Sequence, residues 1–255
     1  MNDSPTYSIW PPLAGVAVAI AITTTMDATG LTMFSSLPLL PLAGLFWYLG
    51  RFPRREMGVT PGSPGGYWWA IAYPVVVPGI LAGTALATGA VDLTEAEWGK
   101  TATQIGIASS VGVIMVFLTE EGFFRGWLWA SLKKTGQDDR RVLVWTSVLF
   151  SLWHLSAVTL DTGFDLPLAQ VPVFMLNACL LGLNWGLIRR LSGSVFAACL
   201  SHAVWNGVVY EMFGFGEKVG ELGIAKTAWF GPEVGILGLV LNALFALVLW
   251  RRVKI

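Results

Sequence analysis

Apolar residues in this chain come in blocks long enough to cross a bilayer, separated by short polar connections. We expect membrane-spanning helices near residues 11–28, 32–50, 67–91, 104–132, 142–160, 168–188, 194–213 and 233–250. The hydrocarbon core of a bilayer needs about 20 apolar residues per helix, which these blocks approach or exceed. The pattern predicts an all-α, polytopic transmembrane bundle of about eight spans, organised as one integral membrane domain over residues 1–255.

The first two blocks are less regular than the others. Asp27 ends the first, and Pro38 and Pro41 fall in the second, so a tight hairpin or a partly re-entrant pair stays open as an alternative. Residues 1–10 contain no Lys or Arg, whereas a cleaved signal peptide begins with a positive segment. We therefore expect the first apolar block to be a retained span.

Basic residues divide unevenly between the two sides of the predicted bundle. With a cytoplasmic N-terminus, twelve of the 16 Lys and Arg residues fall in the cytoplasmic loops and C-terminus, three fall on the other side, and Arg125 lies within a span. Cytoplasmic loops of membrane proteins are enriched in Lys and Arg. The count predicts cytoplasmic N and C termini. A six-span arrangement without the first two blocks keeps the same orientation, so the count does not secure those two.

Composition narrows the function classes. Charged residues make up 13% of the chain and the net charge is zero, which argues against a nucleic-acid partner. The two cysteines, Cys179 and Cys199, lack the spacing of a zinc site and fall in apolar blocks. We expect no disulfide between them and no cofactor. The expected surroundings are the lipid bilayer, and the oligomeric state is left open.

Ionisable residues inside the predicted spans are the candidate chemistry. The fourth span contains Glu120, Glu121 and Arg125, the fifth contains His154, and the seventh contains His202 with Asn206. Each buried charge costs at least about 2–3 kcal/mol in a membrane, so such residues usually serve function or pairing. At about 1.5 Å rise per residue, the three helices carry these groups to similar depths from the cytoplasmic side. One shared site is therefore expected.

Spacing within the helices suggests partners. Glu121 and Arg125 are four residues apart and share a helix face, which predicts an ion pair. Glu120 points about 100° away, so the two histidines on other helices are its expected partners. A carboxylate can take a proton from water, a histidine can orient that water, and a His and Asn pair can stabilise an oxyanion. These residue types suit hydrolysis of a carbonyl compound.

Three spaced motifs resemble a known family. Glu120-Glu121-x-x-x-Arg125, Phe150-x-x-x-His154 and His202-x-x-x-Asn206 occur complete and in order, each in a predicted span. They are similar to the motifs of the CAAX protease and bacteriocin-processing (CPBP, Abi) family, which includes the type II CAAX prenyl endopeptidase. The family-like catalytic core covers about residues 104–213, and the remaining spans match only as apolar segments.

The resemblance implies a metal-independent, glutamate-type endopeptidase embedded in a membrane. The short loops and the lack of a eukaryotic sorting signal in the sequence favour a prokaryotic plasma membrane. Glu120 would be the general base, His154 would help to activate water, and His202 with Asn206 would form the oxyanion hole. Glu121, Arg125 and Phe150 would support this site. The implied partner is a peptide or lipidated protein cleaved near the cytoplasmic side, and whether prenylation is required is left open.

Two alternatives compete with the peptidase. Glu120, His154 and His202 could be zinc ligands of a metal-dependent hydrolase, although the chain has no His-Glu-x-x-His helix. The same polar cluster could instead serve a transporter or a non-enzymatic immunity or scaffold protein, because intramembrane carboxylates and histidines also form proton relays.

Overall fold

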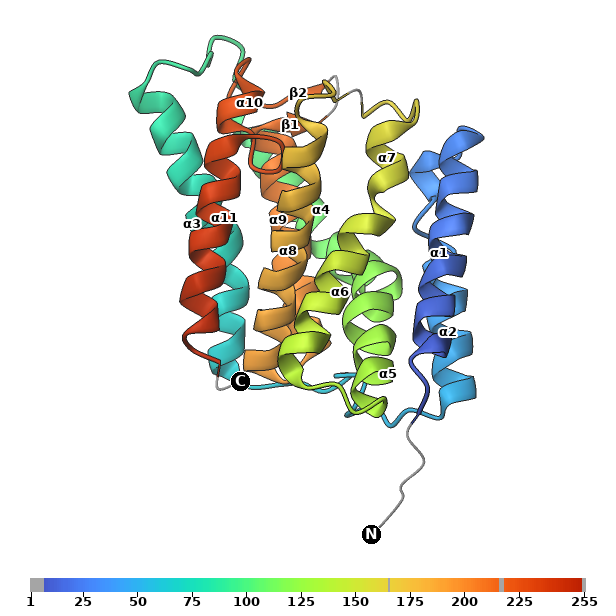
Figure 1. Ribbon diagram of the computed structural model, residues 1–255. Coiled ribbons are helices and arrows are strands. Elements are labelled where there is room, and N and C mark those ends of the chain that lie inside the picture. Colours follow the sequence, from blue (N-terminus) through green and yellow to red (C-terminus); the bar gives the residue numbers. More distant parts are fainter. Residues whose placement is uncertain (1–6, 165, 216–217, 254–255) are drawn as a thin grey trace.

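The computed structural model describes residues 7–164, 166–215 and 218–253, and these form an antiparallel bundle of helices (Figure 1). The helices are α1 (Trp10–Ala28), α2 (Leu39–Gly50), α3 (Pro64–Ala87), α4 (Trp98–Leu118), α5 (Trp129–Lys134), α6 (Asp139–Trp153), α7 (Leu155–Thr159), α8 (Val171–Ser192), α9 (Val195–Met212), α10 (Thr227–Phe230) and α11 (Ile236–Trp250). A 3₁₀ turn, η1 (Thr32–Phe34), precedes α2, and a π-helix, η2 (Gly122–Leu128), joins α4 to α5. The helical fold class predicted from the sequence is confirmed.

Six helical segments in the described part of the chain are long and apolar enough to cross a membrane. They are Trp10–Ala28, Thr32–Gly50, Pro64–Ala87, Trp98–Lys134, Asp139–Thr159 and Val171–Ser192. The helix α11 is apolar but has only 15 residues, and α9 is not among the six. The polar His202, Asn206 and Glu211 lower the hydropathy of α9. The protein is an integral membrane protein, and the count of eight spans stays a prediction.

The first two predicted spans form a helical hairpin beside the rest of the bundle (Figure 1). The carboxylate of Asp27, at the end of α1, accepts a hydrogen bond from Ser156 of α7 at 2.7 Å. Thr23 accepts a second bond, at 2.9 Å, from the indole of Trp153 in α6. These two bonds attach the hairpin to the segment that carries His154.

Asparagines hold the opposite side of the bundle together. Asn242 of α11 donates to the side chain of Asn177 in α8 and accepts a hydrogen bond from Tyr73 of α3. Asn184 of α8 donates to the Asn242 carbonyl. Because lipid offers no hydrogen bonds, polar groups inside a membrane bundle must find partners on other helices. Cys179 and Cys199 are both free thiols.

Two predicted spans are less continuous than expected. The span expected at 104–132 is divided into α4, the π-helix and α5, and the span expected at 142–160 is interrupted at His154. The connection after α9 contains a small antiparallel hairpin of β1 (Gly214–Phe215) and β2 (Lys218–Val219), which the sequence did not predict. The interruption of the first of these spans lies next to Glu120, and that of the second lies at His154.

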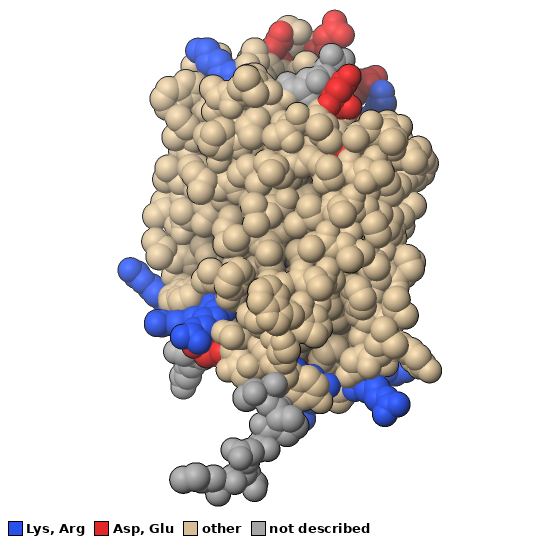
Figure 2. All heavy atoms as spheres, turned by 45° about the vertical axis from the view of Figure 1, so that its right-hand side comes forward, with Lys and Arg blue, Asp and Glu red and all other residues tan. Residues whose placement is uncertain are grey.

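Charged side chains gather at the two ends of the molecule (Figure 2). Lys and Arg cluster at the end where both termini lie, and Asp and Glu are concentrated at the opposite end. The surface between them is almost free of charge in this view, as a bilayer requires. We refer to the Lys- and Arg-rich end as the basic face.

Candidate active site

A break in the fourth predicted span sets the direction of its acidic side chains. Helix α4 ends at Leu118, and Thr119 has a φ of −113° and a ψ of −99°, outside the helical region. The chain then continues through the π-helix from Gly122 to Leu128. A side chain at Gly122 would collide with the carbonyl of Phe117, so glycine permits this close turn. Short π-helical segments are frequently found at functional sites.

His154 lies where α6 ends. Its ring Nδ1 is 2.9 Å from the backbone carbonyl of Phe150, the group to which the His154 amide would bond in a continuing helix. That amide bonds instead to the Ser151 carbonyl at 3.0 Å. The side chain therefore competes with the backbone for one acceptor, and this competition accounts for the interruption between α6 and α7.

Helix α9 presents His202 and Asn206. Ser194 caps the start of the helix by accepting a hydrogen bond from the Phe196 amide, and a left-handed Gly193 makes the tight turn from α8. The His202 ring stacks on Trp185 of α8, with ring centroids 3.7 Å apart and planes 12° apart. The cap and the stacking together fix the height and orientation of the imidazole.

Glu121 lies at the centre of a buried hydrogen-bonded group. Its Oε1 is 3.1 Å from Nη1 of Arg125 and 3.0 Å from Nδ1 of His202. The side chains of Glu121 and Arg125 are completely buried. The ion pair expected from the four-residue spacing is therefore present, and it also includes a histidine from another helix.

Aromatic rings surround the buried guanidinium. Arg125 lies over the Phe150 ring, 4.3 Å from its centroid, and 5.7 Å from the Trp185 centroid. Its Nε and Nη2 have no hydrogen-bond partner among the described residues. The aromatic faces supply part of the missing electrostatic stabilisation, because a cation is attracted to the negative face of a ring. Phe150 thus contacts Arg125 with its ring and His154 with its carbonyl.

Glu120 faces both histidines. Its Oε2 is 3.9 Å from Nε2 of His154 and 3.9 Å from Nε2 of His202. These separations exceed a direct hydrogen bond but can be bridged by one water molecule. The side chains of Glu120 and His154 are 16% and 22% exposed, whereas His202 is 5% exposed, so this part of the cluster is the part open to a small molecule.

The hydrogen-bond partners determine where ring protons lie. A backbone carbonyl can only accept, so His154 carries a proton on Nδ1, and in the neutral ring Nε2 presents a lone pair toward Glu120. The Glu121 carboxylate, paired with Arg125, likewise requires a proton on Nδ1 of His202. Nε2 of His202 can then donate only when the ring is doubly protonated.

Asn206 is one turn beyond His202 on the same helix. Its side chain is half-buried and makes no hydrogen bond to any residue in the described ranges. The helical spacing places its amide on the His202 side of α9. Of the predicted site residues, Asn206 is the one that no direct contact joins to the others.

Three further residues next to the cluster were not singled out from the sequence. Trp185 stacks on His202, and Trp205 donates a hydrogen bond to Glu233 at 2.8 Å. Glu233 is buried, 8% exposed, in the loop before α11. An acidic residue between glycines at the edge of an apolar block was the available signal for Glu233, whereas nothing in the sequence distinguishes these two tryptophans from the other eleven.

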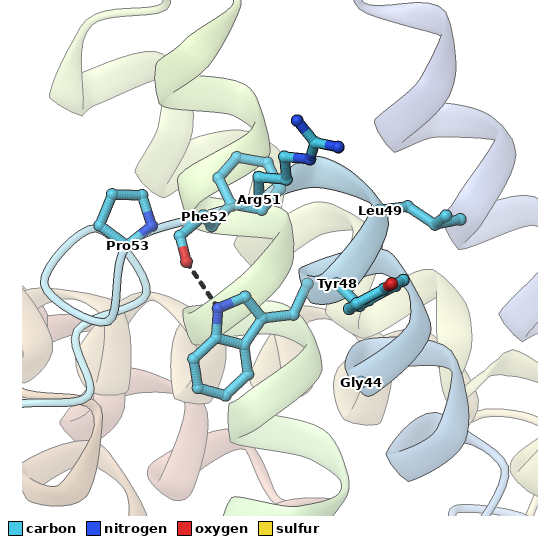
Figure 3. A pocket seen from close by; sticks show the side chains of 7 residues that line it. Gly44, Tyr48, Leu49, Arg51, Phe52 and Pro53 are labelled. Carbon is cyan, nitrogen blue, oxygen red and sulfur yellow. Dashed lines mark hydrogen bonds between the residues drawn. The ribbon is translucent and has the colours of Figure 1, made fainter.

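Within the ranges that the structure describes, no group of three or more His, Cys, Asp or Glu side chains is arranged to hold a metal ion. A hollow at the end of α2, between Gly44 and Pro53, is lined by none of the predicted site residues (Figure 3). There the Trp47 indole donates to the Phe52 carbonyl at 2.6 Å, a contact internal to the helix end.

The fold and the site together define an integral membrane protein with a buried Glu, Arg and His cluster contributed by three helical segments. Residues 103–208 match the family model of the Rce1-like type II CAAX prenyl endopeptidases. This segment contains all three motifs, so the match confirms the family resemblance seen in the sequence. It supports a CAAX-type membrane endopeptidase in general, with a peptide substrate. No curated protein matches the chain.

Proposed function

We propose that this protein is a glutamate-type endopeptidase in which Glu120 is the general base. The observation that carries the proposal is the position of one Glu120 oxygen 3.9 Å from Nε2 of both histidines. A carboxylate in this position can take a proton from a water molecule held between it and a histidine. No serine, cysteine or metal ion is required in this scheme.

The nucleophilic water would lie between Glu120 and His154. Both groups present acceptor atoms, Oε2 of Glu120 and the Nε2 lone pair of His154, so a water molecule there donates both of its hydrogens. Its oxygen lone pairs are then free to approach a carbonyl carbon. This directed arrangement supports His154 as the residue that orients the water.

His202 and Asn206 would stabilise the oxyanion. Donation from Nε2 of His202 requires the doubly protonated ring, because Nδ1 already faces the Glu121 carboxylate. The proposal therefore assigns the doubly protonated ring to the state that stabilises the oxyanion. Asn206 adds an amide donor that no described residue occupies.

The reaction then balances without a cofactor. Water attacks the peptide carbonyl carbon while Glu120 takes one of its protons, and the carbonyl oxygen becomes the oxyanion. When the carbon–nitrogen bond breaks, Glu120 returns the proton to the leaving amine. The products are a new carboxylic acid, which keeps the second proton of the water until it ionises, and a new amine, and Glu120 is again unprotonated. Glu121, Arg125 and Phe150 act by holding His202 and His154 in position.

The proposed substrate is a lipidated CAAX-like peptide, cleaved near the basic face of a prokaryotic plasma membrane. The match to the Rce1-like type II CAAX prenyl endopeptidases supports a lipidated substrate. The position of His202 along α9 supports cleavage near the basic face. From Ser194 at the basic end of α9, His202 is eight residues along the helix, or about 12 Å.

A cleavage assay tests the proposal with a matched control. Purified wild type, Glu120→Gln and Glu56→Gln would be offered a farnesylated CAAX peptide and its unlipidated counterpart, each with and without chelator. We expect Glu120→Gln to lose about 10²–10⁴-fold in rate, as for removal of a general base. Glu56 is an exposed loop carboxylate, so Glu56→Gln should cleave normally.

The outcomes separate the competing hypotheses. Wild-type rates from Glu120→Gln would refute Glu120 as the base. Activity that chelator abolishes and zinc restores would favour the metal-dependent hydrolase. Equal cleavage of both peptides would remove the lipid from the proposal but keep the peptidase. If the wild type cleaves neither peptide, and cells that carry Glu120→Gln keep the wild-type phenotype, the non-enzymatic or transport hypothesis would be favoured.

A further inference from the structure

A second polar site lies on the basic face, apart from the Glu and His cluster. A hollow of about 630 Å³ opens between the loop at residues 55–58, helix α5, and the end of α8. Pockets of roughly 300–1,000 Å³ are of the size that holds small ligands. Five of the side chains that line it are basic: Arg55, Lys133, Lys134, Arg189 and Arg190.

The acidic side chains in the hollow do not balance these charges. The two acidic residues are Glu56 and Asp139, so the lining has an excess of three positive charges. Asp139 is already bonded to Lys133 at 2.8 Å and to Arg190 at 2.7 Å. Arg55 and Arg189 therefore have no carboxylate partner among the described residues.

Arg189 distinguishes this hollow from an ordinary basic loop. The residue is only 6% exposed, and its guanidinium lies 4.2 Å above the centre of the Trp129 ring. One nitrogen, Nη2, donates to the Glu56 carbonyl at 3.0 Å, whereas Nε has no partner in the described part of the chain. A guanidinium that lines the hollow and is held in place by a ring and a backbone carbonyl is suited to an oxyanion of a phosphate or carboxylate.

The position of the hollow decides which anion fits. Its walls are helix ends at the basic face, where the apolar lateral surface of the bundle gives way to charge (Figure 2). Trp129 and Ala130 form an apolar part of the wall. Basic pockets between helices at this level of a membrane are suited to lipid head groups. We infer that the hollow binds the phosphate of an anionic phospholipid from the leaflet at the basic face.

The inference does not depend on the proposed peptidase. Bound lipid would join the α2–α3 loop to α5 and α8, and α8 carries Trp185, which stacks on His202 one turn before Arg189. The lipid would thus stabilise the helix that supports the cluster, whatever reaction the cluster performs.

Native mass spectrometry of the purified full chain in mild detergent tests the inference. The protein would be titrated with phosphatidylglycerol, with phosphatidylcholine, and separately with inorganic phosphate. We expect phosphatidylglycerol to bind in preference to phosphatidylcholine. The Arg55→Gln variant should weaken that binding about fivefold, the equivalent of about 1 kcal/mol for one basic residue near an anionic surface. Arg189→Gln should abolish it.

Arg54→Gln is the matched control, because Arg54 is the exposed neighbour of Arg55 and does not line the hollow. It should bind phosphatidylglycerol as the wild type does. If Arg189→Gln fails to fold, the comparison of phosphatidylglycerol binding by Arg55→Gln and Arg54→Gln still tests whether the hollow is the binding site. Equal binding of both phospholipids, or equal loss in those two variants, would overturn the inference. Binding of inorganic phosphate as strong as that of phosphatidylglycerol would overturn the assignment to lipid.

Discussion

Replacement of Arg125 by methionine probes the buried ion pair directly. Methionine has a similar length but removes the positive charge, and it leaves the completely buried Glu121 carboxylate with His202 as its remaining partner. Removal of one partner of a buried pair typically destabilises a protein by about 3–5 kcal/mol, because an uncompensated charge remains in a low-dielectric interior. We expect a loss in this range.

The structure also indicates how the loss divides. Arg125 makes a cation–π contact with Phe150 at 4.3 Å, which in a desolvated site contributes about 2 kcal/mol. That contact is lost whichever residue occupies position 121. In Arg125→Met/Glu121→Gln the stranded carboxylate is gone, so about 1–3 kcal/mol of the single-variant loss should be recovered. The double variant is therefore expected to be more stable than Arg125→Met alone.

A double-mutant cycle measures this coupling. Wild type, Arg125→Met, Glu121→Gln and the double variant would be unfolded in mixed micelles with increasing fractions of a denaturing detergent. Tryptophan fluorescence would follow the unfolding and give the free energy of unfolding of each protein. A coupling energy below about 0.5 kcal/mol would be indistinguishable from independent sites and would refute the reasoning. The partly exposed pair of Lys133 and Asp139 is the control, with side chains 43% and 23% exposed. Its cycle should give at most about 1 kcal/mol.

Three further substitutions test other parts of the structure. Asn242→Leu removes hydrogen bonds to three helices or loops and should destabilise by about 1–3 kcal/mol in the same unfolding assay, while Asn242→Leu as stable as wild type would contradict their role. Gly122→Ala should lower both stability and activity, since its methyl group meets the Phe117 carbonyl; an unaffected Gly122→Ala would mean that the π-helical turn is not required. Ser156→Ala leaves the buried Asp27 without its hydrogen bond and should destabilise by about 1–3 kcal/mol, whereas no change would indicate that the first hairpin is held by packing alone.

The sequence predicted the helices well because a helix that crosses a bilayer needs a block of about 20 apolar residues. Every block predicted to cross the membrane is mainly helical, although the blocks at 104–132 and 142–160 are each divided into shorter helices. The small β-hairpin after α9 was missed because its two-residue strands leave no periodic pattern.

Within the site, local spacing predicted local contacts only. The Glu121 and Arg125 pair follows from residues four apart on one helix, and it is present. The interruptions at Thr119 and His154 do not follow from spacing, because each depends on competition for one backbone hydrogen bond or on a collision that only the folded chain presents. Periodicity describes regular helices, and these residues lie where regularity ends.

The contact that spacing could least predict is the one that joins the cluster. His202 reaches Glu121 through Nδ1 at 3.0 Å and faces Glu120 through Nε2 at 3.9 Å, so one imidazole connects both carboxylates. Neighbouring carboxylates in one helix point about 100° apart, and a planar ring with nitrogens on two edges spans that angle. The buried Arg125 pair therefore orients His202 as well as Glu121, and so sets which ring nitrogen faces Glu120. The two adjacent acidic residues have different surroundings for this reason, one buried among fixed charges and the other open to a water molecule.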